Sequence, residues 1–332
     1  MKAPSRADYV KAYFTLFDQF EQTQTEVVHL GHPFVYADRI LVVFFTMMLI
    51  RRITAFKAQR RWLETHPDET KQLGFPRLPH RTTLSRRYKD AYETVQHFVA
   101  FIGHWAEQVH ESLNSHVLVE DSSLFKAQGP VWHQSDRRRG RIPEGLRHLD
   151  TDASWRKSGY HGWVYGYGLH LTCNLAGFPK LVQVETGSVA EATVLDAKTE
   201  GILGFHPDVL VGDNGYFKAT RVRNWAKQGV LLLTPATRWK QGGYAQGYHR
   251  FLKEPEPAQW LRARGTAIEP VFDLFCKVLD TQDNQKQLPI QGLANVRTFL
   301  SLGVLAVQVA MIVNNVWGRP LRQISQMLSV FS

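Results

Sequence analysis

The spacing of apolar residues predicts helices over about the first third of the chain. Aromatic and apolar residues recur at helical intervals over residues 9–20, and the apolar run at residues 40–58 predicts a largely buried helix. A loop with several prolines follows, and residues 80–89 predict another helix with a basic face. We therefore expect an all-helical domain over residues 1–115, and its basic helix resembles the second half of a helix-turn-helix.

From residue 116 the pattern changes to short apolar runs separated by turn residues, which is typical of strands. Strands are predicted at residues 117–119, 162–172, 180–185, 209–212 and 230–234, and helices at residues 189–203, 220–228, 266–279 and 296–316. The second and third strands flank an Ala-Gly-Phe-Pro turn, which predicts an antiparallel hairpin. The alternation predicts a mixed α/β domain over residues 116–320, with a basic loop at 126–158, an insertion at 238–260 and a tail at 321–332.

Two of the predicted strands lead into an aspartate. Asp213 follows the strand at residues 209–212, and Asp121 follows the strand at residues 117–119. A carboxylate at the end of a buried strand is costly unless it faces a cleft, a hydrogen-bond partner or a metal, although Asp213 could instead cap a following helix. If the two strands are parallel neighbours, both carboxylates emerge at the sheet edge where α/β proteins bind ligands. Paired carboxylates of this kind suit Mg²⁺ or Mn²⁺.

Composition narrows the class of partner. The chain of 332 residues carries a formal net charge of +10 and a pI near 9.6, which favours a polyanion such as nucleic acid. Cys173 and Cys276 form no zinc-binding or disulfide pattern, which fits a reducing compartment. No signal peptide is recognisable, and the apolar runs predict buried helices, so we expect a soluble cytoplasmic protein with no membrane partner. The phosphate-binding GxxxxGK[ST], HExxH and GxSxG patterns are absent, and no nucleotide cofactor is expected.

Candidate contacts to DNA phosphates come from three basic segments: the helix near residue 85, the loop at residues 126–158 and the segment before residue 280. The cations concerned are Arg81, Arg86, Arg87, Lys89, Arg137, Arg138, Arg139, Arg141, Arg262, Arg264 and Lys277. A solvated helix face and a disordered loop are the alternatives for the first two segments.

Four segments in a fixed order carry a resemblance to a known family. They are VEDSS at residues 119–123, GWVYGYGLH at 162–170, GDNGY at 212–216 and IEPVF at 268–272. Together they resemble the DDE transposases of bacterial insertion sequences over about residues 115–317. The resemblance implies a ribonuclease-H-like mixed sheet flanked by helices, with Asp121, Asp213 and Glu269 as the catalytic acids.

The resemblance also implies a mechanism and partners. The three acids would hold two Mg²⁺ or Mn²⁺ ions, one activating water or a 3′-hydroxyl and the other stabilising the leaving oxygen during cleavage and strand transfer. The partners would be double-stranded DNA at the terminal inverted repeats and the target, with a homodimer or larger assembly on DNA in the bacterial nucleoid. A nuclease without strand transfer and a catalytically degenerate DNA-binding protein are the alternatives.

The chain departs from the family pattern around the glutamate. Many members carry Tyr and Arg seven and four residues before it and Lys seven after it, whereas this chain has Arg262, Gly265 and Cys276 there. Arg264 and Lys277 are each displaced by one residue, which is about 100° around a helix. Asp273, one helical turn after Glu269, is the alternative third acid.

Overall fold

The apolar runs that predict strands pair into one mixed sheet of six strands in the computed structural model of the chain. The structure describes residues 3–24, 35–159, 162–235, 242–283 and 285–332. The strands follow the order β2-β3-β1-β5-β6, and β4 pairs with β3 outside that path. They are β1 (Val117–Lys126), β2 (Ser154–Ser158), β3 (Gly162–Asn174), β4 (Pro179–Thr186), β5 (Val209–Val211) and β6 (Leu231–Leu233). The predicted mixed α/β class is confirmed.

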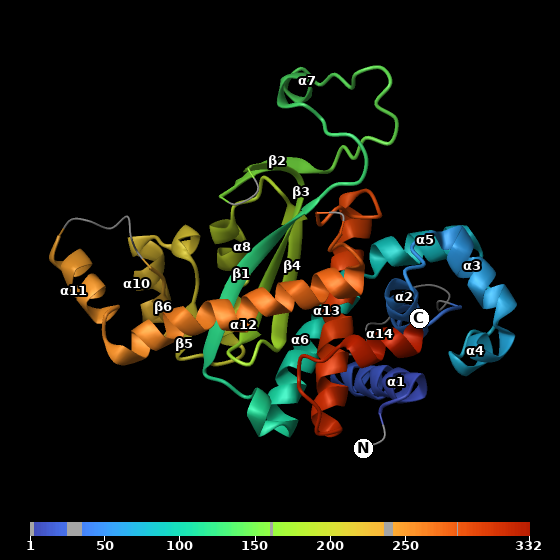
Figure 1. The fold of residues 1–332 in the computed structure, drawn as a ribbon, viewed down its shortest axis with the longest axis horizontal. Coiled ribbons are helices and arrows are strands. Elements are labelled where there is room, and N and C mark those ends of the chain that lie inside the picture. Colours follow the sequence, from blue (N-terminus) through green and yellow to red (C-terminus); the bar gives the residue numbers. More distant parts are fainter. Residues whose placement is uncertain (1–2, 25–34, 160–161, 236–241, 284) are drawn as a thin grey trace.

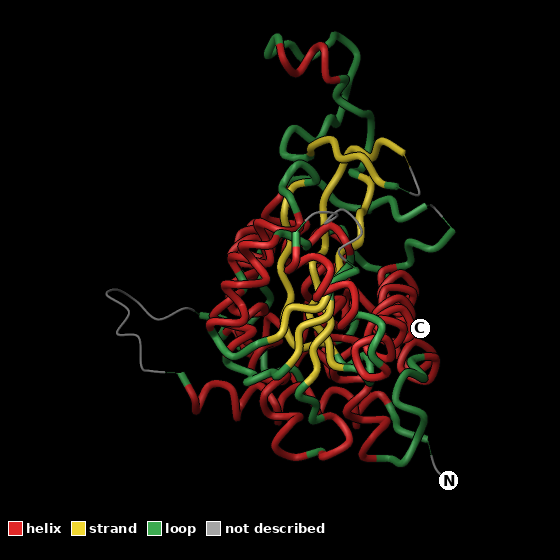
Figure 2. Tube along the Cα trace, turned by 90° about the vertical axis from the view of Figure 1, so that its left-hand side faces the viewer, coloured by secondary structure: helices red, strands yellow, loops and turns green. Residues whose placement is uncertain are grey.

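Helices cover both faces of this sheet (Figures 1 and 2). The N-terminal part consists of α1 (Arg6–Thr23), α2 (Asp38–Ile50), α3 (Phe56–Thr65), α4 (Pro67–Gln72), α5 (Arg81–Asp90), α6 (Tyr92–Val109) and the 3₁₀ turn η1 (Glu111–Leu113). The rest contributes α7 (Gln134–Arg138), α8 (Glu191–Ala197), α9 (Thr199–Leu203), the 3₁₀ turn η2 (Asn214–Tyr216), α10 (Ala219–Lys227), α11 (Gly243–Phe251), α12 (Pro255–Leu279), α13 (Leu293–Val316) and α14 (Ser325–Phe331).

The pairing of the strands matches the prediction where the apolar pattern is strongest. β1 and β5 are parallel neighbours, with Val117 opposite Val209 and Val119 opposite Val211. β3 and β4 form the predicted antiparallel hairpin. Its turn needs Gly177, whose φ of +78° lies in the region that glycine adopts without strain.

Alternate residues of the central strands face two different sets of helices. Val119 and Val211 belong to a large core that includes α12 and α13, whereas Leu118 and Leu210 belong to a smaller core under α8, α9 and α10. Because side chains alternate along a strand, Asp121 lies on the α12 face, like Val119. The two neighbours of Asp121 on β1 face α8 instead.

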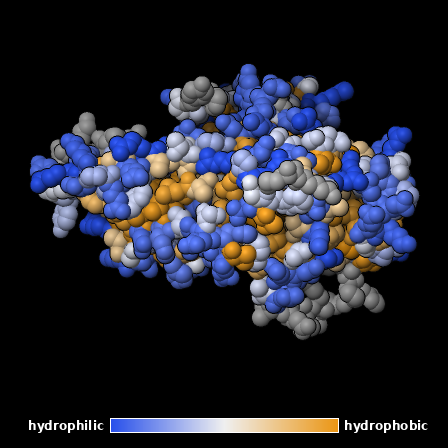
Figure 3. Space-filling model, turned by 60° about the horizontal axis from the view of Figure 1, so that its bottom comes forward, coloured by the Kyte–Doolittle hydropathy of each residue, from blue (hydrophilic) through white to orange (hydrophobic). Residues whose placement is uncertain are grey.

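The helix α13 joins the N-terminal helices to the sheet. It packs against α1, α2, α5 and α6 on one side and against β4 on the other. Its length and composition alone would allow it to cross a membrane, but 94% of its most apolar window is buried inside the molecule, as in the core helix of a globular protein. The predicted division at residue 115 therefore falls between parts that share one hydrophobic core. Hydrophilic side chains cover most of the face seen in Figure 3, with hydrophobic patches between them.

Several predicted elements have different limits in the structure. The basic loop at residues 126–158 contains the end of β1, the short helix α7 and the edge strand β2. The run at residues 40–58 is divided between α2 and α3, and residues 189–203 form two short helices instead of one. The insertion at residues 238–260 contains α11 and the start of α12, and its residues 238–241 lie outside the described part.

The largest difference concerns α12. This helix was expected to begin near residue 266, but it begins at Pro255 and is 25 residues long. Pro255 occupies the first helical position, where the missing N–H costs nothing. Glu269 therefore lies in the middle of the helix instead of its first turn, and Pro270 lies inside the helix.

Candidate active site

Asp121 on β1 and Asp213, two residues after the end of β5, follow the parallel pairing of these two strands. The register that aligns Val119 with Val211 brings Asp121 level with Asp213, two residues further along each chain segment. The two carboxylates are close enough that the negative charge of Asp213 raises the pKa of Asp121. The predicted meeting of the two acids is thus observed, with one correction. Asp121 lies within β1, which continues to Lys126, and does not end the strand.

Asp213 takes the capping role that its sequence context allows. It is the N-cap of η2, and its Oδ1 accepts a hydrogen bond of 2.7 Å from the backbone N–H of Gly215. A side chain at residue 215 would place its Cβ 2.9 Å from Asp213 Oδ1, so glycine lets the turn close over the carboxylate. The cap fixes the orientation of Asp213 beside Asp121.

Asp121 lies in an environment that favours its neutral form. Burial is the main cause that raises its pKa to about 7, while Arg264 and the Ser122 backbone N–H act in the opposite direction. The carboxylates of Asp213 and Glu191 add to the rise. Arg264 Nη1 lies 2.6 Å from Asp121 Oδ2, so the guanidinium supplies the positive charge beside this acid.

A third acid, Glu191, lies at this site although the sequence did not indicate it. Its Oε1 pairs with Arg156 Nη2 at 2.6 Å and accepts a hydrogen bond from Ser122 Oγ. Its Oε2 lies 3.0 Å from the point where a Cβ on Gly215 would be, the same point that Asp213 Oδ1 approaches. Glu191 opens α8 as an ordinary first-turn acid, so only the packing of α8 beside η2 identifies it.

Glu269 does not join these acids in the structure. Its side chain is exposed, and its Oε1 lies 3.3 Å from the position of a Cβ on Gly265, back along its own helix. Five residues separate it from Arg264, which is about 140° around a helix, so the two side chains leave α12 in different directions. Asp273 and Lys277 are also exposed on α12.

A buried ion pair supports β1 directly behind Asp121. Lys198 Nζ lies 2.9 and 2.8 Å from the two carboxylate oxygens of Glu120, and Thr172 Oγ1 donates to Oε2 at 2.6 Å. The Lys198 and Glu120 side chains are only 5% and 1% exposed. Burial raises the pKa of Glu120 and lowers that of Lys198, and each partner opposes the shift of the other. Sequence reasoning missed this pair, because a charged residue within an apolar run gives no indication of its partner.

The chemistry of the donors at Asp121 and Asp213 fits a divalent cation. Both are hard oxygen ligands, and their mutual repulsion is the kind that a cation relieves. Among the described residues, however, no group of three or more His, Cys, Asp or Glu side chains is close enough to hold a metal ion. The fit therefore extends to the pair and not to a complete set of three acids.

The predicted DNA-contacting residues of α5 are divided between surface and interior. Arg81, Arg86 and Lys89 are exposed, whereas Arg87 is buried and pairs with Asp38. The N-cap of this helix is His80, which accepts a hydrogen bond from the Thr82 backbone N–H. A cavity of about 510 Å³ lies at its start, lined by Val35, Tyr36, Arg77, Leu78, His80, Thr83, Arg86 and Arg87.

The arginines of the basic loop lie on and beside α7, which projects from the sheet (Figure 1). Arg138, Arg139 and Arg141 are exposed. Arg137 instead donates to the backbone oxygen of Ala153 at 3.2 Å. In the remaining basic segment Arg262 is exposed, whereas Arg264 is occupied by Asp121.

Known families and structures resemble this chain to different extents. The model of a family described as "Transposase DDE domain" matches residues 114–299, more than half of the chain. A search of curated proteins finds no match. Among solved structures, a piggyBac transposase synaptic complex with hairpin DNA is similar at 9% identity and a TM-score of 0.40, covering 100% of this chain and 81% of that one. A Mos1 transposase paired-end complex with the left transposon end is similar at 10% identity and a TM-score of 0.22, covering 80% and 85%.

Proposed function

The chain belongs to the transposase DDE domain family, and on this basis we propose that it is a DNA transposase. It binds the ends of its own mobile element and catalyses metal-dependent cleavage of phosphodiester bonds, followed by strand transfer. Asp121 and Asp213 are the acids at the centre of the proposal, with Glu269 as the third acid of the family pattern.

One observation supports this proposal most directly. Asp121 lies on β1 and Asp213 just after the parallel neighbour β5, and each is oriented by a backbone N–H from the residue or turn that follows it. Two strands and a capped turn thus hold the acids in place before any ligand binds. Preorganised carboxylates of this kind are what phosphoryl transfer requires, because its catalysis consists largely of positioning and charge stabilisation.

The acids, the backbone groups that orient them and Arg264 would have different roles in the reaction. Asp121 and Asp213 would hold a divalent cation, which when bound activates the attacking hydroxyl and stabilises charge on the leaving oxygen. Ser122 and Gly215 orient the two carboxylates through their backbone N–H groups. Arg264 neutralises Asp121 in the free protein, and its guanidinium has the geometry to bind a phosphate once a cation takes over that task.

Two residues are candidates for the third acid of the site. The family pattern assigns it to Glu269, which would have to turn from its exposed direction on α12 toward Asp121. Glu191 already lies beside the pair. A cleavage assay that compares Glu269→Gln with Glu191→Gln would separate the two. Replacing the catalytic acid should abolish cleavage, and replacing a supporting acid should only reduce it.

The proposal is tested with the DNA that flanks the coding region. Purified protein is incubated with labelled duplexes of each flank in Mg²⁺ or Mn²⁺, and nicks are mapped on both strands. Asp213→Asn should abolish cleavage and leave binding of the ends largely intact, because it removes a charge without changing the shape of the cap. Cleavage by this variant at the wild-type rate would refute the assignment, and a strand-transfer assay with precleaved ends would distinguish a transposase from a nuclease.

One observation favours a second candidate function. The exposed position of Glu269, away from Asp121 and Asp213, is what a catalytically degenerate DNA-binding protein of this family would show. Such a protein would bind the flanking DNA without any divalent ion and would cleave it under none. The same cleavage assay therefore decides between the two candidates.

A further inference from the structure

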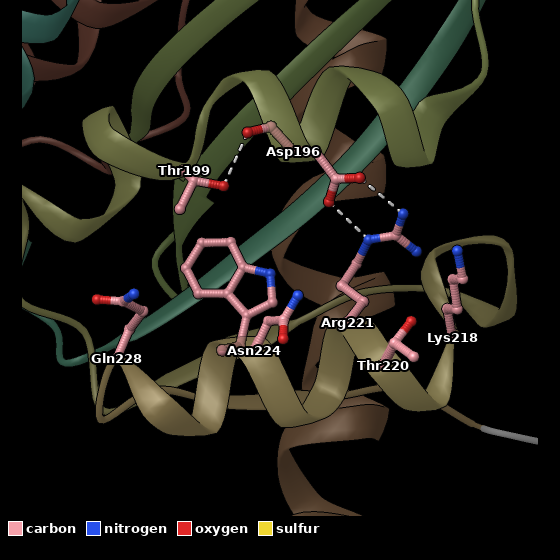
Figure 4. A pocket seen from close by; sticks show the side chains of 8 residues that line it. Asp196, Thr199, Lys218, Thr220, Arg221, Asn224 and Gln228 are labelled. Carbon is pink, nitrogen blue, oxygen red and sulfur yellow. Dashed lines mark hydrogen bonds and ion pairs between the residues drawn. The ribbon is translucent and has the colours of Figure 1, made fainter.

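A polar cavity lies between the helix pair α8–α9 and α10, which cover the face of the sheet opposite the one that Asp121 faces. Its volume is about 310 Å³. It is lined by Asp196, Thr199, Lys218, Thr220, Arg221, Asn224, Trp225 and Gln228. Figure 4 shows the side chains of Lys218, Arg221 and Asn224 rising from the α10 side toward Asp196 on the opposite helix. Most of the groups that face this opening are hydrogen-bond donors.

Arg221 connects the cavity to the turn that Asp213 caps. Arg221 Nε and Nη2 bind the two oxygens of Asp196 at 2.7 and 2.8 Å. Its Nη1 donates to the backbone oxygen of Tyr216 at 3.0 Å, at the end of the turn that Asp213 caps. The opposite wall belongs to α8, the helix that begins with Glu191. The same elements therefore form the cavity and position the acids.

The charges in the cavity favour an anion. Arg221 and Lys218 both lower the pKa of Asp196, so one carboxylate faces two cations. Asp196 is the single acid among the lining residues, and Thr220, Asn224 and Gln228 add neutral donors. Lys218 is exposed, so its ammonium group is accessible to a ligand without a rearrangement of buried residues. The site has one positive charge in excess and a rim of donors.

We propose that this cavity binds a backbone phosphate of the DNA on which the acidic pair acts. The inference rests on the proposed transposase function, and it identifies Lys218 and Asn224 as DNA contacts that the sequence did not suggest. Lys218 would form the ion pair with the phosphate, and the Asn224 amide would donate a hydrogen bond to it. Arg221 would hold the cavity in shape through Asp196.

The test measures the salt dependence of DNA binding. A fluorescein-labelled duplex of unrelated sequence is titrated by anisotropy over a series of KCl concentrations, without divalent ions. Losing one phosphate contact lowers the slope of log K against log[salt] by about 0.9. Lys218→Gln should reduce the slope by that amount and weaken binding, and Lys218→Arg should restore both. Asn224→Asp, which adds a carboxylate of the same shape, should weaken binding as well.

A matched control lies on the same helix. Lys227 is exposed in the last turn of α10 but does not line the cavity, so Lys227→Gln should leave the slope unchanged. Equal effects of Lys218→Gln and Lys227→Gln would overturn the inference, because they would show a general effect of charge. If Lys218→Gln and Asn224→Asp bind DNA as the wild type does, the inference about the cavity is overturned and the proposed function stands. A wild-type protein that does not bind duplex DNA would refute both.

Discussion

Replacing Lys198 by methionine should lower the free energy of unfolding by about 3–5 kcal/mol, because it leaves the Glu120 carboxylate buried without its partner. The size follows from the environment. Glu120 is 1% exposed, and both of its oxygens lie within 2.9 Å of Lys198 Nζ. After the substitution its remaining hydrogen-bond donor is Thr172 Oγ1. A methionine fills the space of the lysine stem, so the loss comes mainly from the charge.

A double variant separates the charge from the packing. Lys198→Met combined with Glu120→Gln should recover most of the stability, because a neutral amide can still accept the hydrogen bond from Thr172. The exposed helical pair of Arg60 and Glu64 is the control, and Arg60→Met should cost about 0.5 kcal/mol or less. Urea-induced unfolding followed by circular dichroism and tryptophan fluorescence gives all the values.

The pH dependence provides an independent check of the same substitution. Glu120 has a pKa raised above its unfolded value of 4.5. As the pH rises above 4.5, the unfolded state releases the Glu120 carboxyl proton at a lower pH than the folded state does. The stability contributed by protonated Glu120 is therefore present at low pH and is lost as the pH rises. The loss caused by Lys198→Met should therefore shrink as the pH falls toward 4.5. A loss below about 1 kcal/mol at neutral pH, or no recovery in the double variant, would refute the reasoning.

Three further predictions follow from single contacts. Arg264→Gln should tighten the binding of Mn²⁺ measured by calorimetry without DNA, because Asp121 no longer shares its charge with the guanidinium; an unchanged affinity would contradict this. Glu191→Gln should reduce cleavage by about 10- to 100-fold, the usual cost of removing a group that supports a metal ligand, and full activity would exclude that role. Burial lowers the pKa of Lys180 from 10.5 to about 8, while its partner Glu107 opposes the shift. Between these pH values the unfolded state binds more protons, so stability should gain from this group as the pH rises, and the difference between wild type and Lys180→Met in urea unfolding should show that gain.

The meeting of Asp121 and Asp213 could be predicted from the sequence because two local patterns determine it. Each acid follows an apolar run by the same number of residues, and parallel pairing of those runs aligns everything that follows them. The strand β2 could not be predicted in the same way. Its sequence, Ser-Trp-Arg-Lys-Ser, has no apolar alternation, and it forms at the edge of the sheet because β3 offers it a partner.

The partners of the acids depend on helix phase, which local patterns do not determine. Arg264 reaches Asp121 because α12 begins at Pro255 and crosses the sheet at that angle. A start near residue 266 would leave Arg264 outside the helix and Glu269 in its first turn. Glu191 reaches the site because α8, which ends at Ala197, packs beside η2, which begins at Asn214. Such contacts are determined by tertiary packing instead of by spacing.

The long helix α13 has a consequence for where DNA would be cut. It contains 24 residues, so it is about 36 Å long, and it packs against both α5 and β4. Thr298 of α13 donates a hydrogen bond to the Tyr88 carbonyl of α5, and the adjacent Arg297 pairs with Glu185 of β4, so one helix holds α5 and the sheet together. DNA bound at α5 would therefore be cut at a fixed distance from the bound sequence. Inserting base pairs between that sequence and the end of the element would move the cut away from the end by the same number.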